Sequence, residues 1–196
     1  MWAFRVTGER KYIERSAREM CMYLKRLQRA DGLFDHAPGV PFAWGRGDGW
    51  MAAGMALNLK YLPDGSEWRA PILDGYRRMM TTLMCRQRAS GLWGQLVDDD
   101  ESWDETSGSA MFAYALAEGV NNGWLADRDT CSRAVDRAYA ALAARVDEYG
   151  NLGGVCVGTG KRKSRDWYMS RPTCAGDPHG QAPLMWLCGA LMDATP

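Results

Sequence analysis

A short turn recurs along this chain at a fixed interval, and that recurrence limits the fold more than any other feature. Its three copies are Gly32-Leu33-Phe34, Gly91-Leu92-Trp93 and Gly150-Asn151-Leu152, so the glycine moves from 32 to 91 to 150, 59 residues each time. Each copy follows a helical pattern and precedes a loop and then a second helix. A unit of this size is a helix pair that cannot bury its apolar face alone. The sequence therefore predicts an array of packed helix pairs.

The two helices of each pair are expected to differ in their surfaces. The first helices are amphipathic, with apolar residues every three or four positions, over roughly 9–29, 67–88 and 128–146. The second helices are apolar on nearly every side and rich in Ala, Gly and Met, over Trp50–Leu62, Ser107–Val120 and His179–Met192. An outer ring of amphipathic helices around an inner ring of small-residue helices is an α/α barrel. The predicted fold class is therefore all-α.

Three helix pairs are too few to close such a barrel, because a closed (α/α)6 toroid contains six pairs. Residues 1–7 match the end of a further inner helix. An open arc of three pairs would also leave the apolar faces of the inner helices exposed to water. We therefore expect residues 1–196 to form a single partial domain, about half of a toroid. A complete bundle of three pairs is the alternative.

Charge and cysteine content restrict the classes of partner. Lys plus Arg equals Asp plus Glu at 24 each, and the densest basic cluster, Lys161-Arg162-Lys163 with Arg165, is too short to indicate nucleic acid binding. No signal peptide or membrane span is recognisable, so no membrane partner is expected. The six cysteines contain no C-x-x-C pair and are predicted to be buried free thiols. These features predict a cytoplasmic protein.

Candidate functional residues lie in the loops that lead into the inner helices, at 33–49, 92–106 and 151–178. In an α/α barrel these loops open at the same end, where the positive ends of the helix dipoles favour an anionic ligand such as a uronate. With two histidines in the chain, a His-based metal site is not expected, and no cofactor is predicted. Gly158-Thr159-Gly160-Lys161 lacks the spacing and the preceding strand of a phosphate loop.

Trp44, Arg46 and Trp50 are the strongest candidates for binding a sugar. A guanidinium matches a sugar carboxylate, and two indoles can form the walls of a sugar-sized slot. The alternative is a Trp–Arg stack that only holds the loop in place. His36 could contact the ligand or be a satisfied loop histidine. His179, with Asp177 before it, could belong to the site or to a helix cap.

The acidic stretch Asp98–Glu105 has a structural interpretation. Consecutive carboxylates on a loop are usually solvated, and those near a helix start interact favourably with its dipole. Thr106 or Ser107 is the expected N-cap of the following helix. We therefore predict a capping loop rather than a catalytic carboxylate pair.

The tract Phe42-Ala43-Trp44-Gly45-Arg46-Gly47-Asp48-Gly49-Trp50 resembles the W-x-R-G-x-G-W signature of glycoside hydrolase family 105. This is the family of unsaturated rhamnogalacturonyl hydrolases, related to the unsaturated glucuronyl hydrolases. The remaining motifs agree in order and extend the resemblance nearly from end to end: Gly32-Leu33-Phe34 with His36, Glu105–Ala115, Gly158-Thr159-Gly160 and Asp177–Ala182.

The resemblance implies an (α/α)6 barrel of which this chain is the C-terminal half. It implies release of 4,5-unsaturated galacturonic acid from pectin-derived oligosaccharides by hydration of the vinyl ether double bond. Carried over by position, His36, Trp44, Arg46 and Trp50 match residues of the family's active site, and His179 is a further candidate. The family's catalytic aspartate lies upstream of this chain, so the isolated half is expected to be inactive.

Asp48 departs from the pattern of relatives, which often carry Asn or an apolar residue there, and it is a candidate substitute acid. Two other functions stay open. One is a non-catalytic sugar-binding or scaffold protein that self-associates through the open edges of the half-barrel. The other is an α/α-barrel epimerase, which two histidines make the weakest candidate because such enzymes usually use several.

Overall fold

The computed structural model describes residues 2–193 and is built from helices with two short strand pairs. The helices are α1 (Trp2–Thr7), α2 (Arg10–Leu27), α3 (Gly45–Tyr61), α4 (Arg69–Arg86), α5 (Thr106–Asn121), α6 (Arg128–Ala143), α7 (Arg165–Met169) and α8 (Pro178–Asp193). The antiparallel strand pairs are β1 (Trp93–Gly94) with β2 (Asp104–Glu105), and β3 (Val155–Cys156) with β4 (Thr173–Cys174).

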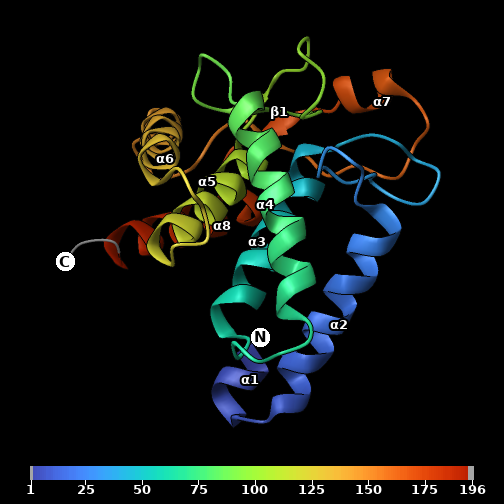
Figure 1. The fold of residues 1–196 in the computed structure, drawn as a ribbon. Helices are drawn as coiled ribbons and strands as arrows, with labels where there is room; N and C mark the ends of the chain where they lie inside the picture. The colour runs from blue at the N-terminus through green and yellow to red at the C-terminus, as the bar shows by residue number, and fades with distance from the viewer. Residues whose placement is uncertain (1, 194–196) are drawn as a thin grey trace.

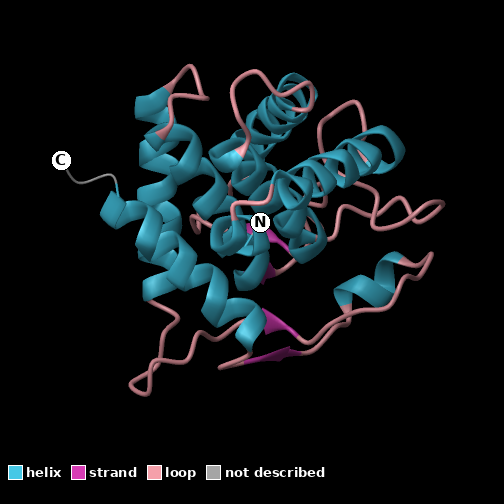
Figure 2. Ribbon diagram, turned by 90° about the horizontal axis from the view of Figure 1, so that it is seen from below, coloured by secondary structure: helices cyan, strands magenta, loops and turns pink. Residues whose placement is uncertain are grey.

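The long helices form two layers. The inner helices α3, α5 and α8 pack side by side in that order, and α2, α4 and α6 lie against them as the outer layer (Figure 1). α5 occupies the centre, and every residue from Thr106 to Gly119 is buried. The strand pairs lie in the loops that lead into α5 and α8, next to the helices (Figure 2). The predicted arrangement of three helix pairs is confirmed.

The repeat seen in the sequence is also a repeat of tertiary contacts. Gly32, Gly91 and Gly150 all have positive φ, at 88°, 87° and 83°, a backbone conformation that side chains with a Cβ rarely adopt. In the first copy the Gln28 amide donates to the carbonyls of Gly32 and Gly75. In the second copy, Gln87 donates to Gly91 and Ala134, 59 residues further on at each position. In both copies, therefore, a glutamine at the same position of the repeat anchors the turn to the next outer helix.

The start of the first inner helix differs from the prediction. We expected the helix to begin at Trp50, because the five residues before it, 45–49, are glycine, arginine or aspartate. In the structure α3 begins at Gly45. The Gly45 amide donates to Gln95 O at 2.8 Å, and a Cβ at this position would lie 2.7 Å from Gly94 O. Glycine here permits contact between the helix end and the neighbouring loop, so Arg46 and Asp48 belong to a helical turn.

Close packing between α3 and α5 depends on further glycines. A Cβ on Gly108 would lie 2.6 Å from the Gly45 carbonyl carbon, and one on Gly49 would lie 2.8 Å from Met111 Sδ. These distances are shorter than side chains tolerate. The small residues that predicted an inner layer therefore have a direct structural role.

The cysteines agree with the prediction only in part. All six are free thiols, but burial is confirmed only for Cys131 and Cys156. Cys85 is exposed on the outer helix α4, and the other three thiols are partly buried. Within residues 2–193, no helix is long and apolar enough to cross a membrane.

Candidate functional site

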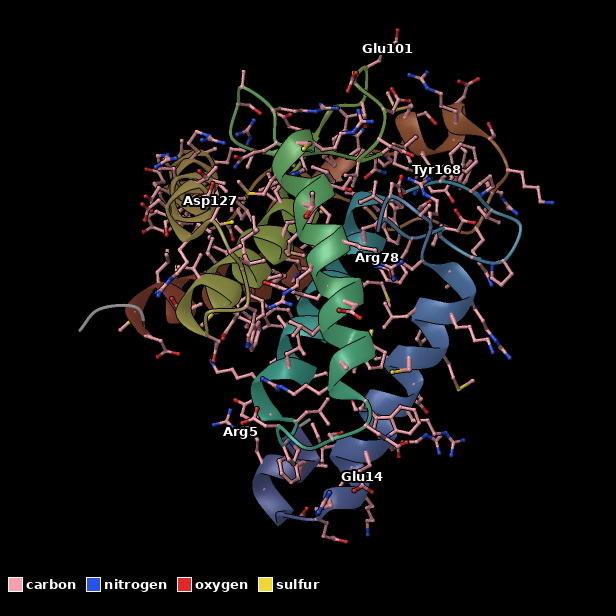
Figure 3. All side chains as sticks on the ribbon, in the orientation of Figure 1. Arg5, Glu14, Arg78, Glu101, Asp127 and Tyr168 are labelled. Atoms are coloured by element: carbon pink, nitrogen blue, oxygen red, sulfur yellow. The ribbon has the colours of Figure 1, made fainter. Side chains whose placement is uncertain are left out.

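The three loops that lead into α3, α5 and α8 meet at one end of the molecule. From the first inner helix, Gly45 hydrogen-bonds to Gln95 of the second loop, and Arg46 Nη1 donates to Cys156 O of the third at 2.7 Å. In Figure 3, Tyr168 and Glu101 from these loops lie at the end opposite Arg5 and Glu14. The prediction that the lead-in loops share one end is therefore confirmed for residues 2–193. We call this end of the molecule the mouth.

Arg46 stacks on Trp44 and is almost fully buried. Its guanidinium carbon lies 5.0 Å from the Trp44 ring centroid, and 3% of the residue is exposed. Arg46 also helps to lower the pKa of Asp177 in the third loop, after the larger effect of the backbone hydrogen bond from His179. The guanidinium therefore acts electrostatically across the mouth, and its stack on Trp44 also holds the start of α3 in place.

Gln95 connects all three loops, although it was not among the predicted site residues. Its side chain is fully buried, accepts from Trp44 Nε1 at 3.2 Å, and donates to Tyr168 O at 3.2 Å. Buried amides of this kind fix the relative positions of the groups they join because an unmade hydrogen bond is costly. Gln95 therefore fixes Trp44 relative to the third loop.

His36 also packs beside Trp44 and contacts Tyr168. The His36 Nδ1 and Tyr168 Oη are 2.6 Å apart, and the His36 and Trp44 ring centroids are 4.9 Å apart. Burial lowers the pKa of His36, and the positive charge of Lys161 lowers it further. Tyr168 was not among the predicted site residues. It lies on α7, a five-residue helix inside a stretch that was predicted to be loop.

Trp50 belongs to a second aromatic group and does not face Trp44. Its ring centroid lies 6.4 Å from that of His179 and 5.9 Å from that of Trp186, and 45% of the residue is exposed. Asp177 Oδ1 accepts from the His179 backbone amide and lies 2.8 Å from His179 Nδ1. Asp177 thus caps α8 and orients the imidazole. The two indoles form two separate surfaces of the mouth.

Glu105 is the N-cap of α5, in place of the predicted Thr106 or Ser107. Its buried carboxylate accepts from the backbone amides of Ser107, Gly108 and Cys156. A carboxylate is preferred here because it accepts several bonds at once and interacts favourably with the helix dipole. The third loop is therefore attached to the second inner helix through one acidic side chain.

The rest of the acidic stretch is held in place by ion pairs. Its carboxylates form ion pairs with five arginines: Asp98 with Arg29, Asp99 and Glu101 with Arg165, Asp100 with Arg86, and Asp104 with Arg88 and Arg145. The hydrogen bond from Arg165 is the main cause of the lowered pKa of Asp99. These pairs hold the second loop over the outer helices.

Asp48 is buried at the first turn of α3. Its Oδ1 accepts from the Phe34 amide at 2.8 Å, and its Oδ2 has no hydrogen-bond partner. Burial raises the pKa of Asp48 well above its usual range. Among residues 2–193, no cluster of three or more His, Cys, Asp or Glu side chains could hold a metal ion.

Two layers of α/α pairs with an aromatic and cationic mouth are typical of the toroidal glycoside hydrolases, and comparison with known proteins agrees. The family model for Glycosyl Hydrolase Family 88 matches residues 35–193. The chain belongs to this family. The resemblance to family 105 is also confirmed: the glycoside hydrolase from family 105 of C. acetobutylicum superimposes with a TM-score of 0.84 and 25% identity over 97% of this chain and 61% of that one.

Curated relatives fall into two size classes. Protein Atu3128 of Agrobacterium fabrum is 31% identical over 91% of this chain and 90% of its own length. The unsaturated 3S-rhamnoglycuronyl hydrolase of Formosa agariphila is 38% identical, but over 57% of this chain and 30% of the relative. The unsaturated rhamnogalacturonyl hydrolase YesR of Bacillus subtilis is 32% identical over 70% of this chain and 37% of the relative. The match thus spans 30% and 37% of the length of these two named hydrolases.

Proposed function

We propose that this chain forms the sugar-binding side of an unsaturated uronyl hydrolase, with residues 1–196 as one partial domain that corresponds to the C-terminal half of a six-hairpin catalytic domain. The observation that carries the proposal is the position of Arg46, which hydrogen-bonds to Cys156 of the third lead-in loop and stacks on Trp44 of the first. Arginine surrounded by aromatic rings is well suited to an anionic sugar.

The proposed reaction is the release of 4,5-unsaturated galacturonic acid from rhamnogalacturonan or pectin fragments. An acid protonates the vinyl ether double bond, water adds to the neighbouring carbon, and the hemiketal formed opens to free the aglycone. The W-x-R-G-x-G-W tract and the activity named for YesR support this substrate class. No metal or cofactor takes part in this reaction.

Each residue predicted to bind the sugar has a role in this proposal. Arg46 attracts the uronyl carboxylate, Trp44 forms one wall, and His36 lies next to that wall with its orientation fixed by Tyr168. Trp50 and His179 form the second aromatic surface, on the side of α8. The acid that protonates the double bond comes from the other half of the toroid. The isolated 196 residues are therefore proposed to bind sugar without turnover.

The proposal is tested by combining this chain with an upstream half from a family 105 enzyme and following the absorbance of the unsaturated uronyl group. Loss of absorbance in the mixture, and none with either half alone, is the expected result. Absence of turnover in a mixture shown by sizing to form a complex would contradict the proposal.

Binding to the isolated chain gives a second test. We expect Arg46→Ala to weaken binding of an unsaturated uronyl disaccharide about thirtyfold, since a charge-assisted hydrogen bond contributes about 2 kcal/mol. Lys161→Ala is the matched control, because Lys161 is an exposed cation of the same mouth and should change binding less than threefold on the same scale. Tryptophan fluorescence measures both. Equal losses of affinity in the two variants would contradict a sugar-binding role for Arg46.

A non-catalytic sugar-binding or scaffold protein is the second candidate function. It is favoured by the relative of the same size, Protein Atu3128, and by the exposed apolar side chains Met185 and Met192 on α8. Self-association through this open edge would then give a stable dimer without hydrolysis, which light scattering after sizing would detect. The six free thiols support a reducing compartment, which we propose is the cytoplasm.

A further inference from the structure

Positive charge is concentrated on and around α7, at the mouth of the molecule (Figure 1). Residues 158–171 contain five Lys and Arg residues and one acid, Asp166, although the whole chain has equal numbers of basic and acidic residues. Of the five, Arg165 is paired with Asp99 and Glu101. The other four form no ion pair with a carboxylate of residues 2–193: Lys161, Arg162, Lys163 and Arg171. The third loop therefore carries positive charge that the described chain does not neutralise.

Two of these four cations share one aromatic ring. The guanidinium carbons of Arg162 and Arg171 lie over the Trp167 ring, 5.4 Å and 4.8 Å from its centroid. Trp167 Nε1 donates to Thr159 Oγ1 at 2.7 Å, which holds the ring in place. An indole attracts each cation, but the two cations repel each other. A bound anion would offset this repulsion. We call Arg162, Trp167 and Arg171 the guanidinium–indole cluster.

The cluster has accessible hydrogen-bond donors. Arg171 is partly exposed, and it is fixed by bonds from its Nε to Gly158 O at 3.1 Å and from its Nη2 to Val157 O at 3.2 Å. A guanidinium has five N–H donors, and those on Arg171 Nη1 have no partner among the described residues. Arg162 is exposed, and its guanidinium makes no hydrogen bond within the same residues. A fixed guanidinium beside a free one is well suited to a carboxylate or a sulfate.

The guanidinium–indole cluster borders the Arg46 site. A Cβ built on Gly158 would lie 3.7 Å from Arg46 Nη2, and the Gly158 carbonyl accepts from Arg171. The same short backbone segment therefore lies beside both arginines. Lys161 is a separate cation, because its charge acts on His36. A sugar chain held at Arg46 therefore meets the cluster when it extends along the third loop.

We propose that the guanidinium–indole cluster is a second anionic subsite, which binds a carboxylate or a sulfate on the part of the substrate beyond the unsaturated sugar. The proposal rests on the proposed function in taking Arg46 as the site of the unsaturated uronate, and it adds that the aglycone is acidic. A polygalacturonate fragment has a carboxylate on each sugar, whereas a rhamnose next to the unsaturated sugar is neutral. The cluster therefore favours fragments of the first kind.

The test compares two probes that differ by one charge. They are unsaturated digalacturonate and the same disaccharide methyl-esterified on its reducing-end sugar, and calorimetric titration measures their binding to the intact chain. The free acid should bind about tenfold more tightly, the equivalent of one hydrogen bond to a charged group. This preference should shrink as added salt screens the charges. Equal affinities for the two probes would overturn the proposal.

Substitutions assign the preference to the cluster. Arg162→Ala is the main variant, because its guanidinium holds no backbone group, whereas Arg171 also fixes the third loop. Arg162→Ala should reduce the preference to about threefold or less and leave the affinity for the methyl ester unchanged. Arg18→Ala removes the same charge from an exposed position of α2 and is the matched control, with the full preference retained. A folded Arg162→Ala variant with the full preference would overturn the proposal.

A third probe distinguishes the two sources of negative charge. It is the methyl ester with a sulfate group on its reducing-end sugar. Tight binding of this probe, lost in Arg162→Ala, would support a subsite for either anion. Tight binding of the free acid alone, with the same dependence on Arg162, would support a subsite for carboxylates.

Arg46→Ala separates failure of this inference from failure of the proposed function. Weaker binding of both unsaturated probes in this variant, with no preference for the free acid in the wild type, would overturn the second subsite alone. A preference for the free acid that depends on Arg162, with no effect of Arg46→Ala on either probe, would support the subsite and contradict the proposed function.

Discussion

The inner helices α5 and α8 have the same length and a similar composition, yet they sit in different environments. Both have 16 residues, contain several Ala and Gly, and are otherwise largely apolar. α5 lies between α3 and α8 and is buried on every side, whereas α8 has a neighbour on one side and exposes Met185 at 73% and Met192 at 76%. The same kind of sequence is therefore core in one position and surface in the other.

This difference explains why an apolar helix does not by itself reveal its surroundings. A Cβ on Gly108 of α5 would meet the backbone of Gly45, but one on Gly189 of α8 would meet nothing within 4 Å. In solved relatives such as the C. acetobutylicum enzyme, this chain covers 61% of the longer chain, so those proteins have further chain beyond the matched part. The α8 surface has the composition of a helix-packing face.

The largest expected effect comes from matched methionine truncations. Met111→Ala in α5 should lower the free energy of unfolding by about 2–5 kcal/mol, because it opens a cavity in a fully buried layer. Met185→Ala in α8 should change it by less than about 0.5 kcal/mol. Urea unfolding monitored by circular dichroism measures both. A cost for Met185→Ala that grows with protein concentration would mean that another molecule covers α8.

Glycine substitutions test the same comparison, because replacing glycine by alanine should lower the stability of the protein in α5 and raise it in α8. Gly108→Ala should destabilise the protein by about 1–3 kcal/mol, because its Cβ would lie 2.6 Å from backbone atoms. Gly189→Ala should stabilise it by about 0.5 kcal/mol or more, since alanine is the better helix former and the space is open. Thermal unfolding of the two variants is the measurement. Destabilisation by Gly189→Ala would show that α8 is packed more closely than the structure has it.

The smallest expected effect on stability concerns α3, the inner helix on the other side of α5, which contains the buried Asp48. Its folded-state pKa lies above its unfolded value, so the folded protein holds a proton that the unfolded chain has lost. Stability from this group is fully present below the unfolded pKa, near 4, and is lost as the pH rises through the folded pKa. Asp48→Asn should remove this loss, so the stability of the variant should depend less on pH than that of the wild type. Unfolding curves from pH 4 to pH 8 test this, and equal slopes would contradict it.

Most of the helix layout could be predicted from the sequence, because periodicity is a local property. The outer helices begin and end within about three residues of the predicted ranges. The exception was Gly45–Gly49, where glycines suggested a loop. Their real role is close approach to the second lead-in loop, and a contact between distant segments leaves no local pattern in the sequence.

The sequence predicted several residues of the candidate site, but it did not predict which of them lie together. The signature pointed to Trp44, Arg46 and Trp50 as one cluster, but the rings of Trp44 and Trp50 have different partners. Gln95 and Tyr168 were missed, because a buried amide or phenol acquires its role only from the groups that the fold brings to it. The unpartnered oxygen of Asp48 likewise became visible only when its neighbours were known.

The sequence by itself determined the repeating helix pair, the division into amphipathic and apolar helices, and the family, because these depend on the spacing and type of residues along one chain. Only the tertiary structure decided that Arg46 is buried against Cys156, that Glu105 links two loops, and that α8 keeps an exposed apolar face. Burial and hydrogen bonding depend on segments far apart in sequence. Their energies exist only once those segments are packed together.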